Sequence, residues 1–471
     1  MVFHSFQFFI FLLITYTVFR LFPRQYQWGV LLIGSLVFYG YYSWPATLIL
    51  LGLSVIMFFI GQQLEAASPR NQAAVLWSGI VLNVGVLGYF KYTNFFLQNV
   101  AQLSGRNFEP LAIFLPVGIS FYVFQAMAYL LDIYLGKIRA ERHLGYFCLY
   151  LAFFPKLLQG PIERAADLIP QLKQEYQPDR PRDLQALQMI LWGLFYKLSI
   201  ADRIALLVDP VFANLGVYSG FPLFVIVNFY TLQIYFDFAG YTHIARGVGL
   251  LFGIRLSENF NHPYWATNIQ DFWRRWHMTF SFWIRDYLFV PLVAAYRYRG
   301  SWGIAAAAVL TFLIAGIWHG ASWGFVVFGL IHGIYMAVSI ATLKTRNRWV
   351  KSWRLPAWLV TGYRMIILFE MITFSFIFFR AETLSDAGWI IRNIFSAALP
   401  ASLWEVVSIW QAILLAVVFW AIGWKYALLA WEKAGKLQHG LIRWQIFNAF
   451  VLNCIIFLGV ISGGAYLYFI F

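Results

Sequence analysis

The chain has 471 residues, of which 61% are hydrophobic, 20% aromatic and only 11% charged, and its mean hydropathy is +0.68. Soluble domains carry about 25% charged residues, so this composition excludes an ordinary globular protein and predicts a polytopic membrane protein. The net charge of +14 comes from short loops with no nucleic-acid-binding motif beside them. It therefore indicates membrane topology and contact with anionic lipid headgroups rather than a nucleic-acid partner.

Apolar runs that could cross about 30 Å of hydrocarbon follow one another along the chain. They cover residues 6–20, 29–61, 73–96, 111–135, 184–208, 221–238, 301–318, 325–343, 359–379, 406–430 and 447–471. The first has no basic segment before it and no cleavage site, which predicts a retained helix. Because proline disfavours helix in the residue before it, Pro45 is expected to split 29–61 into two helices. Roughly ten to twelve crossings are expected.

The larger basic loops lie at 137–142, 173–182 and 344–354. Positive loops stay in the cytoplasm, so these loops are predicted to be cytoplasmic and the N-terminus external. The chain has neither a flexible linker nor the matched halves of a transporter. We expect a single membrane domain over residues 1–471.

Two segments are unsuited to regular helices. Residues 153–164 contain two prolines and a glycine, which predicts a re-entrant loop. Between 256 and 299, charged and aromatic residues alternate too densely for a lipid-facing helix. Irregular backbone at membrane depth is tolerated where it is buried in protein or lines a cavity. Residues 256–335 are therefore predicted to form a central funnel that carries the chemistry.

Two histidines are the candidate catalytic residues. His319 follows the uncharged run 302–315, and an ionisable side chain in such a setting indicates a functional site. His277 lies in the irregular segment, and both are expected to reach one cavity from different helices. A neutral imidazole can take a proton from a hydroxyl and return it to a leaving group. On spacing alone, two satisfied polar residues that pack helices remain an alternative.

Two further buried polar residues are expected to play supporting roles. On a continuous helix His332 would face nearly the opposite way from His319, unless the nearby glycines break the helix. A carboxylate at Asp237 costs roughly 2.5–3.5 kcal/mol unless it is paired. Arg274, Arg275 or a histidine is its expected partner, in a structural ion pair. No spacing favours a metal site.

An ordered series of motifs resembles the bacterial membrane-bound O-acyltransferase (MBOAT) family, in the branch of alginate and cellulose O-acetylation. The motifs are residues 88–92, 115–122, 159–162, 233–238, 258–261, 271–277 and 318–323. The resemblance implies an all-α ring of helices around a thin centre, pierced by a tunnel. It also implies that His319 is catalytic and His277 its companion. His243 and Val293-Ala294 depart from the common pattern, so contacts near them are not carried over.

The expected mechanism has His319 deprotonate an acceptor hydroxyl as it attacks a thioester carbonyl, while His277 orients it or donates to the oxyanion. Trp318 and Trp276 would exclude water. The other expected tunnel or supporting residues are Asp237, Tyr235, Arg274, Arg275, Ser322, Asn261 and His332.

No bound cofactor is expected, and acetyl-CoA or an acyl carrier thioester would be the donor substrate. The resemblance implies a bacterial inner-membrane protein that works with membrane lipid, an extracytoplasmic acetyltransferase and a polysaccharide synthase complex. D-alanyl transfer from an acidic carrier protein docked on the basic face is one alternative. A transporter that does no chemistry is another.

Overall fold

A computed structural model describes residues 1–352, 355–397, 422–424, 440–460 and 466–467. In these residues six helices are long and apolar enough to cross a membrane, and three shorter apolar helices accompany them. The predicted class, an all-α polytopic membrane protein, is confirmed. The expected total of crossings stays a prediction, because the expected span 406–430 lies almost wholly outside the described residues.

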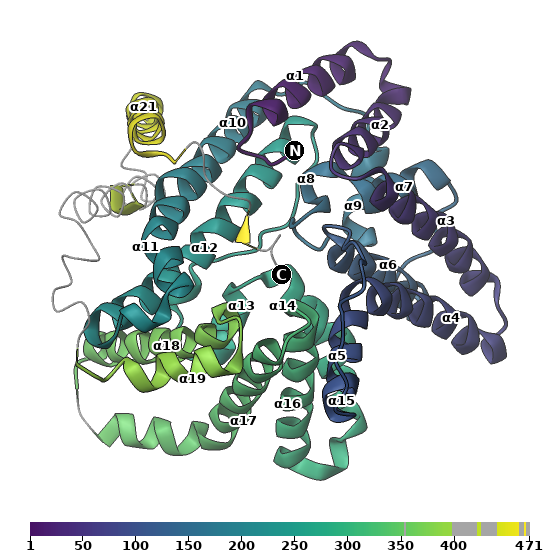
Figure 1. Cartoon of the computed structure of the whole chain (residues 1–471). Helices are drawn as coiled ribbons and strands as arrows, with labels where there is room; N and C mark the ends of the chain where they lie inside the picture. Colours follow the sequence, from purple (N-terminus) through teal and green to yellow (C-terminus); the bar gives the residue numbers. More distant parts are fainter. Residues whose placement is uncertain (353–354, 398–421, 425–439, 461–465, 468–471) are drawn as a thin grey trace.

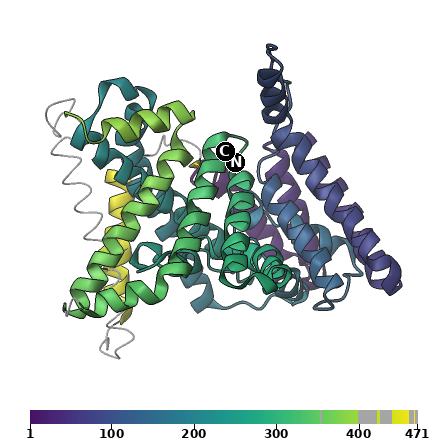
Figure 2. The ribbon, with the colours of Figure 1, turned by 90° about the horizontal axis from the view of Figure 1, so that it is seen from below.

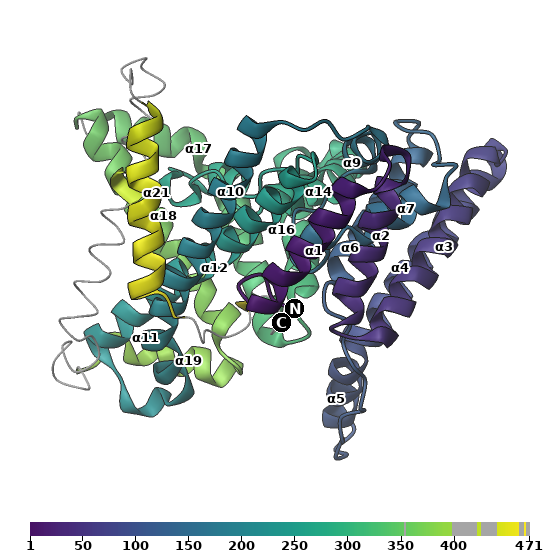
Figure 3. The same ribbon diagram turned by 90° about the horizontal axis from the view of Figure 1, so that it is seen from above.

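The N-terminal helices follow the predicted runs. They are α1 (Phe6–Leu21), α2 (Gln27–Gly40), α3 (Trp44–Ala66), α4 (Pro69–Leu87) and α5 (Thr93–Leu103). The predicted break within 29–61 is confirmed, because Ser43 caps α3 by accepting from the Ala46 amide and Pro45 lies in its first turn. A π turn, Gly88–Tyr92, joins α4 to α5. Figure 3 shows α5 projecting beyond the other helices.

The span expected over 111–135 begins later, as α6 (Ile119–Tyr134). Gly118 precedes it with a φ of 80°, a conformation that favours glycine. A Cβ on Gly118 would also collide with the carbonyl oxygen of Leu157. This close approach brings the start of α6 against the segment 153–164.

The segment 153–164 is irregular, as predicted. It lies between α7 (Leu144–Ala152) and α9 (Ala165–Lys173), and its only helix is the four-residue α8 (Phe154–Leu157). Nearly all of its residues are buried. Buried irregular backbone of this kind needs partners inside the protein.

Long helices then alternate with short ones. α10 (Arg180–Leu194) passes through a π turn, Phe195–Ala201, into α11 (Asp202–Ala213), and α12 (Gly220–Leu251) extends well beyond the expected 221–238. The predicted change of character after 256 is confirmed. That region begins with irregular backbone and the short helix α13 (Ile269–Arg275). After it, α14 (Met278–Ile284) continues through a π turn, Arg285–Phe289, into α15 (Val290–Ala295).

The C-terminal third returns to long helices. They are α16 (Gly300–His319), α17 (Trp323–Ser352), α18 (Ala357–Arg380), α19 (Leu384–Asn393) and α21 (Gly440–Leu458). Glycines allow α16 and α17 to pack closely, since a Cβ on Gly316 would meet the backbone of Gly329 within 3 Å. The two helices form a tight hairpin that ends next to His319.

Figure 1 shows long helices arranged around a centre that holds α8, α13 and α14, and Figure 2 shows the purple and blue N-terminal helices on one side of the molecule. Both ends of the chain contribute to this centre. Phe3 stacks on Tyr241 at 4.6 Å between ring centroids, and Tyr466 packs on the same ring at 5.1 Å. The arrangement agrees with the expected ring of helices around a centre.

One face of the molecule collects many basic loop residues. Ion pairs join Arg24 to Glu175, Lys173 to Glu141 and Arg142 to Glu65, so these loops lie on the same side. We call this side the basic face. The turn between α2 and α3 lies at the opposite end of α2 from Arg24, so it belongs to the other face.

Candidate active site

A cavity of about 300 Å³ contains His319. Its lining is Tyr42, Lys91, residues 115–121, Leu158, Trp318 and His319. His319 is the last residue of α16 and is 6% exposed, whereas Tyr42 and Leu115 are 52% and 38% exposed. Because Tyr42 lies in the turn between α2 and α3, the cavity opens away from the basic face.

Lys91 and Tyr92 hold the end of α16. Lys91 Nζ donates to the carbonyl oxygens of Trp318 and His319, both at 2.8 Å, and the Tyr92 hydroxyl donates to that of Ile317 at 2.7 Å. The last carbonyls of a helix have no partner within the helix, and a cation there offsets the negative end of the helix dipole. The π turn therefore fixes the backbone on which His319 stands.

His277 lies in the turn between α13 and α14, and its side chain is fully buried. Its φ of 40° is in the left-handed region, which costs a non-glycine residue about 1–3 kcal/mol and persists only where the surroundings enforce it. His277 lies outside the candidate spans. Burial lowers the pKa of His277 to about 3, so the imidazole is neutral near pH 7.

The left-handed conformation of His277 is held by neighbouring residues that hydrogen-bond to this turn. The Asn261 amide donates to the Arg275 carbonyl at 2.9 Å, and the Met278 amide donates to the Asn259 carbonyl at 2.8 Å. The side chain of Asn259, which is 1% exposed, places Oδ1 3.1 Å from His277 Nδ1. The backbone on both sides of His277 is thereby tied to residues 259–261.

Trp318 and Phe280 connect the two histidines. Their rings stack at 4.3 Å. Phe280 lies 5.0 Å from the His277 ring and 5.5 Å from the His319 ring, and Trp318 lies 6.3 Å and 5.0 Å from the same two rings. One aromatic pair thus lies against both histidines, but the cavity lining includes His319 and not His277, so the expectation that both reach one cavity stays a prediction.

His332 belongs to a neighbouring layer. The chain breaks between α16 and α17, so the continuous helix on which its position was estimated does not exist. His332 Nε2 is 2.9 Å from Ser375 Oγ, and Trp273 Nε1 donates to His332 Nδ1 at 3.3 Å. Phe328 packs against both His332 and His319, at 4.6 and 5.7 Å. This placement fits the supporting role predicted for His332.

The expected partners of Asp237 are wrong. Asp237 Oδ1 pairs with Lys197 Nζ at 2.8 Å, and Oδ2 accepts from the Leu467 amide at 2.9 Å. Lys197 also pairs with Asp202 at 2.9 Å. A buried carboxylate needs such a partner, but the lysine comes from the π turn before α11. Asp237 therefore joins α12 to that π turn and, through the Leu467 amide, to the C-terminal segment.

The arginines expected beside Asp237 lie elsewhere. Arg274 and Arg275 both pair with Asp271, at 3.4 and 2.9 Å, and Arg274 is exposed. Asn261 is also exposed. None of the three is buried, unlike His277.

The remaining expected residues surround the site at greater distance. Trp276 packs against Tyr235 at 6.2 Å and Phe272 at 5.5 Å. Phe260 lies 5.1 Å from Trp276 and 5.0 Å from Phe238, and Phe238 touches His277 at 4.7 Å. Ser322 is half-buried at the start of α17. Of the two tryptophans expected to exclude water, Trp318 is the one against both histidines.

Sequence reasoning missed Asn259 and Lys91 as site residues, although both lie within the motifs given above. Lys91 is a cation in an apolar run, the same signal that drew attention to His319 and Asp237. Asn259 sits among several polar residues, so nothing in the sequence distinguishes it from exposed Asn261.

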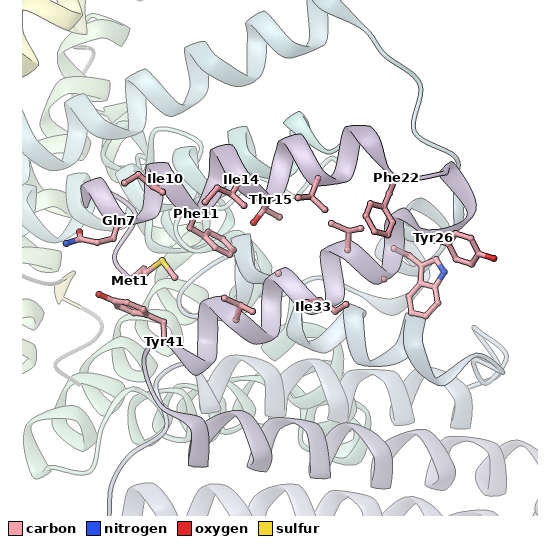
Figure 4. Close-up of a pocket in the computed structure, with 16 residues that line it drawn as sticks. Met1, Gln7, Ile10, Phe11, Ile14, Thr15, Phe22, Tyr26, Ile33 and Tyr41 are labelled. Atoms are coloured by element: carbon pink, nitrogen blue, oxygen red, sulfur yellow. The ribbon is translucent and has the colours of Figure 1, made fainter.

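A second groove, larger than the cavity at His319, lies apart from the histidines. It occupies about 730 Å³ between α1 and α2 and is lined mainly by apolar side chains such as Ile10, Phe11, Ile14 and Ile33 (Figure 4). It contains none of the candidate site residues. Its composition fits contact with lipid chains and offers no chemistry. Among the described residues, no group of three or more His, Cys, Asp or Glu side chains could hold a metal ion.

Comparison with known proteins identifies the family. Residues 76–380 match the sequence profile of MBOAT, the membrane-bound O-acyltransferase family. The chain belongs to this family. The matched region contains Lys91, Asn259, His277 and His319, so the geometry described above belongs to the part of this O-acyltransferase that defines the family.

The chain is also similar to individual curated proteins of this family. The chain is 34% identical over 392 residues to a probable alginate O-acetylase AlgI of Azotobacter vinelandii, and the aligned region covers 81% of the chain and 75% of the relative. It is 34% identical over 419 residues to a peptidoglycan O-acetyltransferase of Helicobacter pylori, with coverage of 81% and 76%. It is 30% identical over 280 residues to a teichoic acid D-alanyltransferase of Bacillus subtilis, with coverage of 56% and 67%. The chain is therefore an acyltransferase.

Proposed function

We propose that this acyltransferase moves an acetyl group from a cytoplasmic thioester to hydroxyl groups of an exported polysaccharide. The observation that carries the proposal is the position of His319 in a cavity that opens away from the basic face. Basic loops favour the cytoplasm, so this geometry gives the histidine an opening toward the outside. The protein would lie in a bacterial inner membrane with its N-terminus external.

In this proposal His319 takes the proton of the attacking hydroxyl. The hydroxyl oxygen bonds to the thioester carbonyl carbon, the carbon–sulfur bond breaks, and the proton passes from His319 to the departing thiolate. The products are an ester and a free thiol. Trp318 and Phe280 would keep water from the thioester, since both rings pack against His319.

The thioester would approach from the basic face. Acetyl-CoA carries phosphates and an acyl carrier protein is acidic, so either donor would be attracted by the loops 137–142 and 173–182, which hold more basic than acidic residues. The polysaccharide would be an alginate-like or cellulose-like polymer. An extracytoplasmic acetyltransferase and a polysaccharide synthase would be partners on the acceptor side.

The test uses purified full-length protein in liposomes with acetyl-CoA labelled in the acetyl group. We expect thiol release and label transfer to an added polysaccharide, both lost in the His319→Ala variant. Label transfer by that variant at the rate of the unaltered protein would overturn the assignment of His319. Movement of substrate across the bilayer without thiol release would instead indicate a transporter.

D-alanyl transfer is the second candidate, favoured by the likeness to the teichoic acid D-alanyltransferase and by the basic face. Offering acetyl-CoA, an acetylated carrier protein and a D-alanylated carrier protein in parallel separates the two. We expect acetyl transfer, because the relatives named as O-acetylases and O-acetyltransferases match more of the chain.

A further inference from the structure

Asn259 controls which nitrogen of His277 carries the proton. Its Oδ1 accepts from the Thr279 amide at 3.2 Å and from Thr279 Oγ1 at 2.8 Å, which identifies this atom as the oxygen. His277 Nδ1 lies 3.1 Å from the same oxygen. An amide oxygen can only accept, so Nδ1 must be the protonated nitrogen of a neutral His277.

The remaining nitrogen is then a lone pair without a partner. His277 Nε2 is fully buried and has no hydrogen-bond partner among the described residues. Leaving a buried acceptor unsatisfied costs about 1–3 kcal/mol, so such an atom indicates a ligand that supplies a donor. The rings packed on His277 come from Phe121, Phe238, Phe280 and Trp318, none of which can take part in proton exchange.

Thr279 links this arrangement to the buried segment 153–164. The Ile162 amide donates to Thr279 Oγ1 at 3.0 Å, so the threonine hydroxyl must direct its own proton to Asn259. Two oxygens of Glu163 accept from the amide and hydroxyl of Ser257, which anchors the start of the same loop. The proton positions from Ile162 to His277 are therefore fixed in one direction.

We propose that Asn259, held by Thr279, is a positioning residue that locks neutral His277 as a hydrogen-bond acceptor at Nε2 for an O–H or N–H group of the bound substrates. This rests on the proposed acyl transfer. It replaces the oxyanion-donor role considered for His277, since a neutral ring whose proton is engaged by Asn259 has none to donate at Nε2.

Thr279 offers a matched pair of variants for the test. Thr279→Ser keeps the hydroxyl that joins Ile162 to Asn259, whereas Thr279→Val keeps the shape and loses the hydroxyl. We expect the serine variant to retain kcat/KM for acetyl transfer within about 3-fold. The valine variant should lose about 10²-fold, the lower end of what a positioned acid–base group contributes. Equal activity of the two variants would overturn the proposal.

Asn259→Asp tests the direction of the hydrogen bond. The aspartate preserves Oδ1 and replaces an Nδ2 group that has no partner among the described residues. A carboxylate at Nδ1 stabilises the imidazolium and raises the pKa of His277. Protonation removes the acceptor, so the acid limb of kcat/KM should move to higher pH. His319, the titratable group across the aromatic pair, is unaltered in this variant.

A donor role for His277 predicts the opposite shift of the pH profile. If His277 acts as a donor, the imidazolium is the active form, and Asn259→Asp should extend activity to higher pH instead. That outcome, or an unchanged pH profile, would overturn the proposal. The unaltered protein separates the two hypotheses, because absence of thiol release there refutes the proposed acyl transfer itself. Circular dichroism and thermal unfolding of each variant identify any that fail to fold.

Discussion

The two histidines are held in opposite ways. His319 ends a long apolar helix, and its position depends on backbone carbonyls that Lys91 and Tyr92 cap from a distant turn. His277 lies on strained backbone between two short helices, and a network of side chains fixes it. The site therefore combines a helix end held by long-range capping with a turn held by local polar contacts. Substitutions at the two histidines and their partners should therefore affect activity in different ways.

The largest effect should come from His319 itself. His319→Gln removes the group proposed to take the hydroxyl proton while preserving most of its volume. The rate of acetyl transfer should fall by about 10²–10⁴-fold, the usual contribution of a general base, with KM for the thioester little changed. Steady-state kinetics in detergent measure both constants. A variant with unchanged kcat and a raised KM would show that His319 only binds substrate.

Lys91→Met tests whether the cap matters as much as the imidazole. It leaves two carbonyls without their donor, each costing about 1–3 kcal/mol when buried, and allows the end of α16 to shift. We expect kcat to fall by about 10-fold to 100-fold. Lys91→Arg keeps the charge and several donors, so it should recover part of the activity. If methionine and arginine behave alike, the cap is not what positions His319.

Asp237→Asn should separate stability from chemistry. It weakens the pairing of buried Lys197, and breaking a buried ion pair costs about 3–5 kcal/mol, reduced here because Asp202 remains in contact. The thermal unfolding temperature should therefore drop while kcat per folded molecule changes by less than about 3-fold. A loss of kcat in fully folded protein would place Asp237 in the chemistry instead.

The contrast between the histidines also explains what sequence could predict. His319 was found because an imidazole at the end of an apolar run is conspicuous, and the α2–α3 break was found because Pro45 acts locally. The side chains that contact these residues are harder to predict from the sequence. Lys91 meets His319 across more than 200 positions in the chain, and hydrophobic periodicity says nothing about which helix ends meet.

The error at Asp237 has the same origin. Arg274 and Arg275 are basic residues of the neighbouring irregular segment, which is why the sequence favours them as partners. Asp271 lies one helical turn away from them, however, and pairs with both. Lys197, by contrast, lies in an apolar stretch where a single cation must find a carboxylate. Matching buried charges of opposite sign would have selected Lys197 for Asp237, because no Lys or Arg lies between Arg203 and Arg246, although Lys197 also pairs with the nearby Asp202.

His332→Gln should give the smallest effect and thereby mark the edge of the site. Phe328 stands against both His332 and His319, so His332 reaches the reaction only through packing. Glutamine can still meet Ser375, and we expect kcat within about 5-fold of the unaltered protein with a loss of roughly 1 kcal/mol in stability. A pH profile with the same limbs as the unaltered enzyme is the decisive readout. If the profile changes, a proton at His332 is linked to catalysis, and the site would then extend through Phe328 into the layer of Trp273 and Ser375.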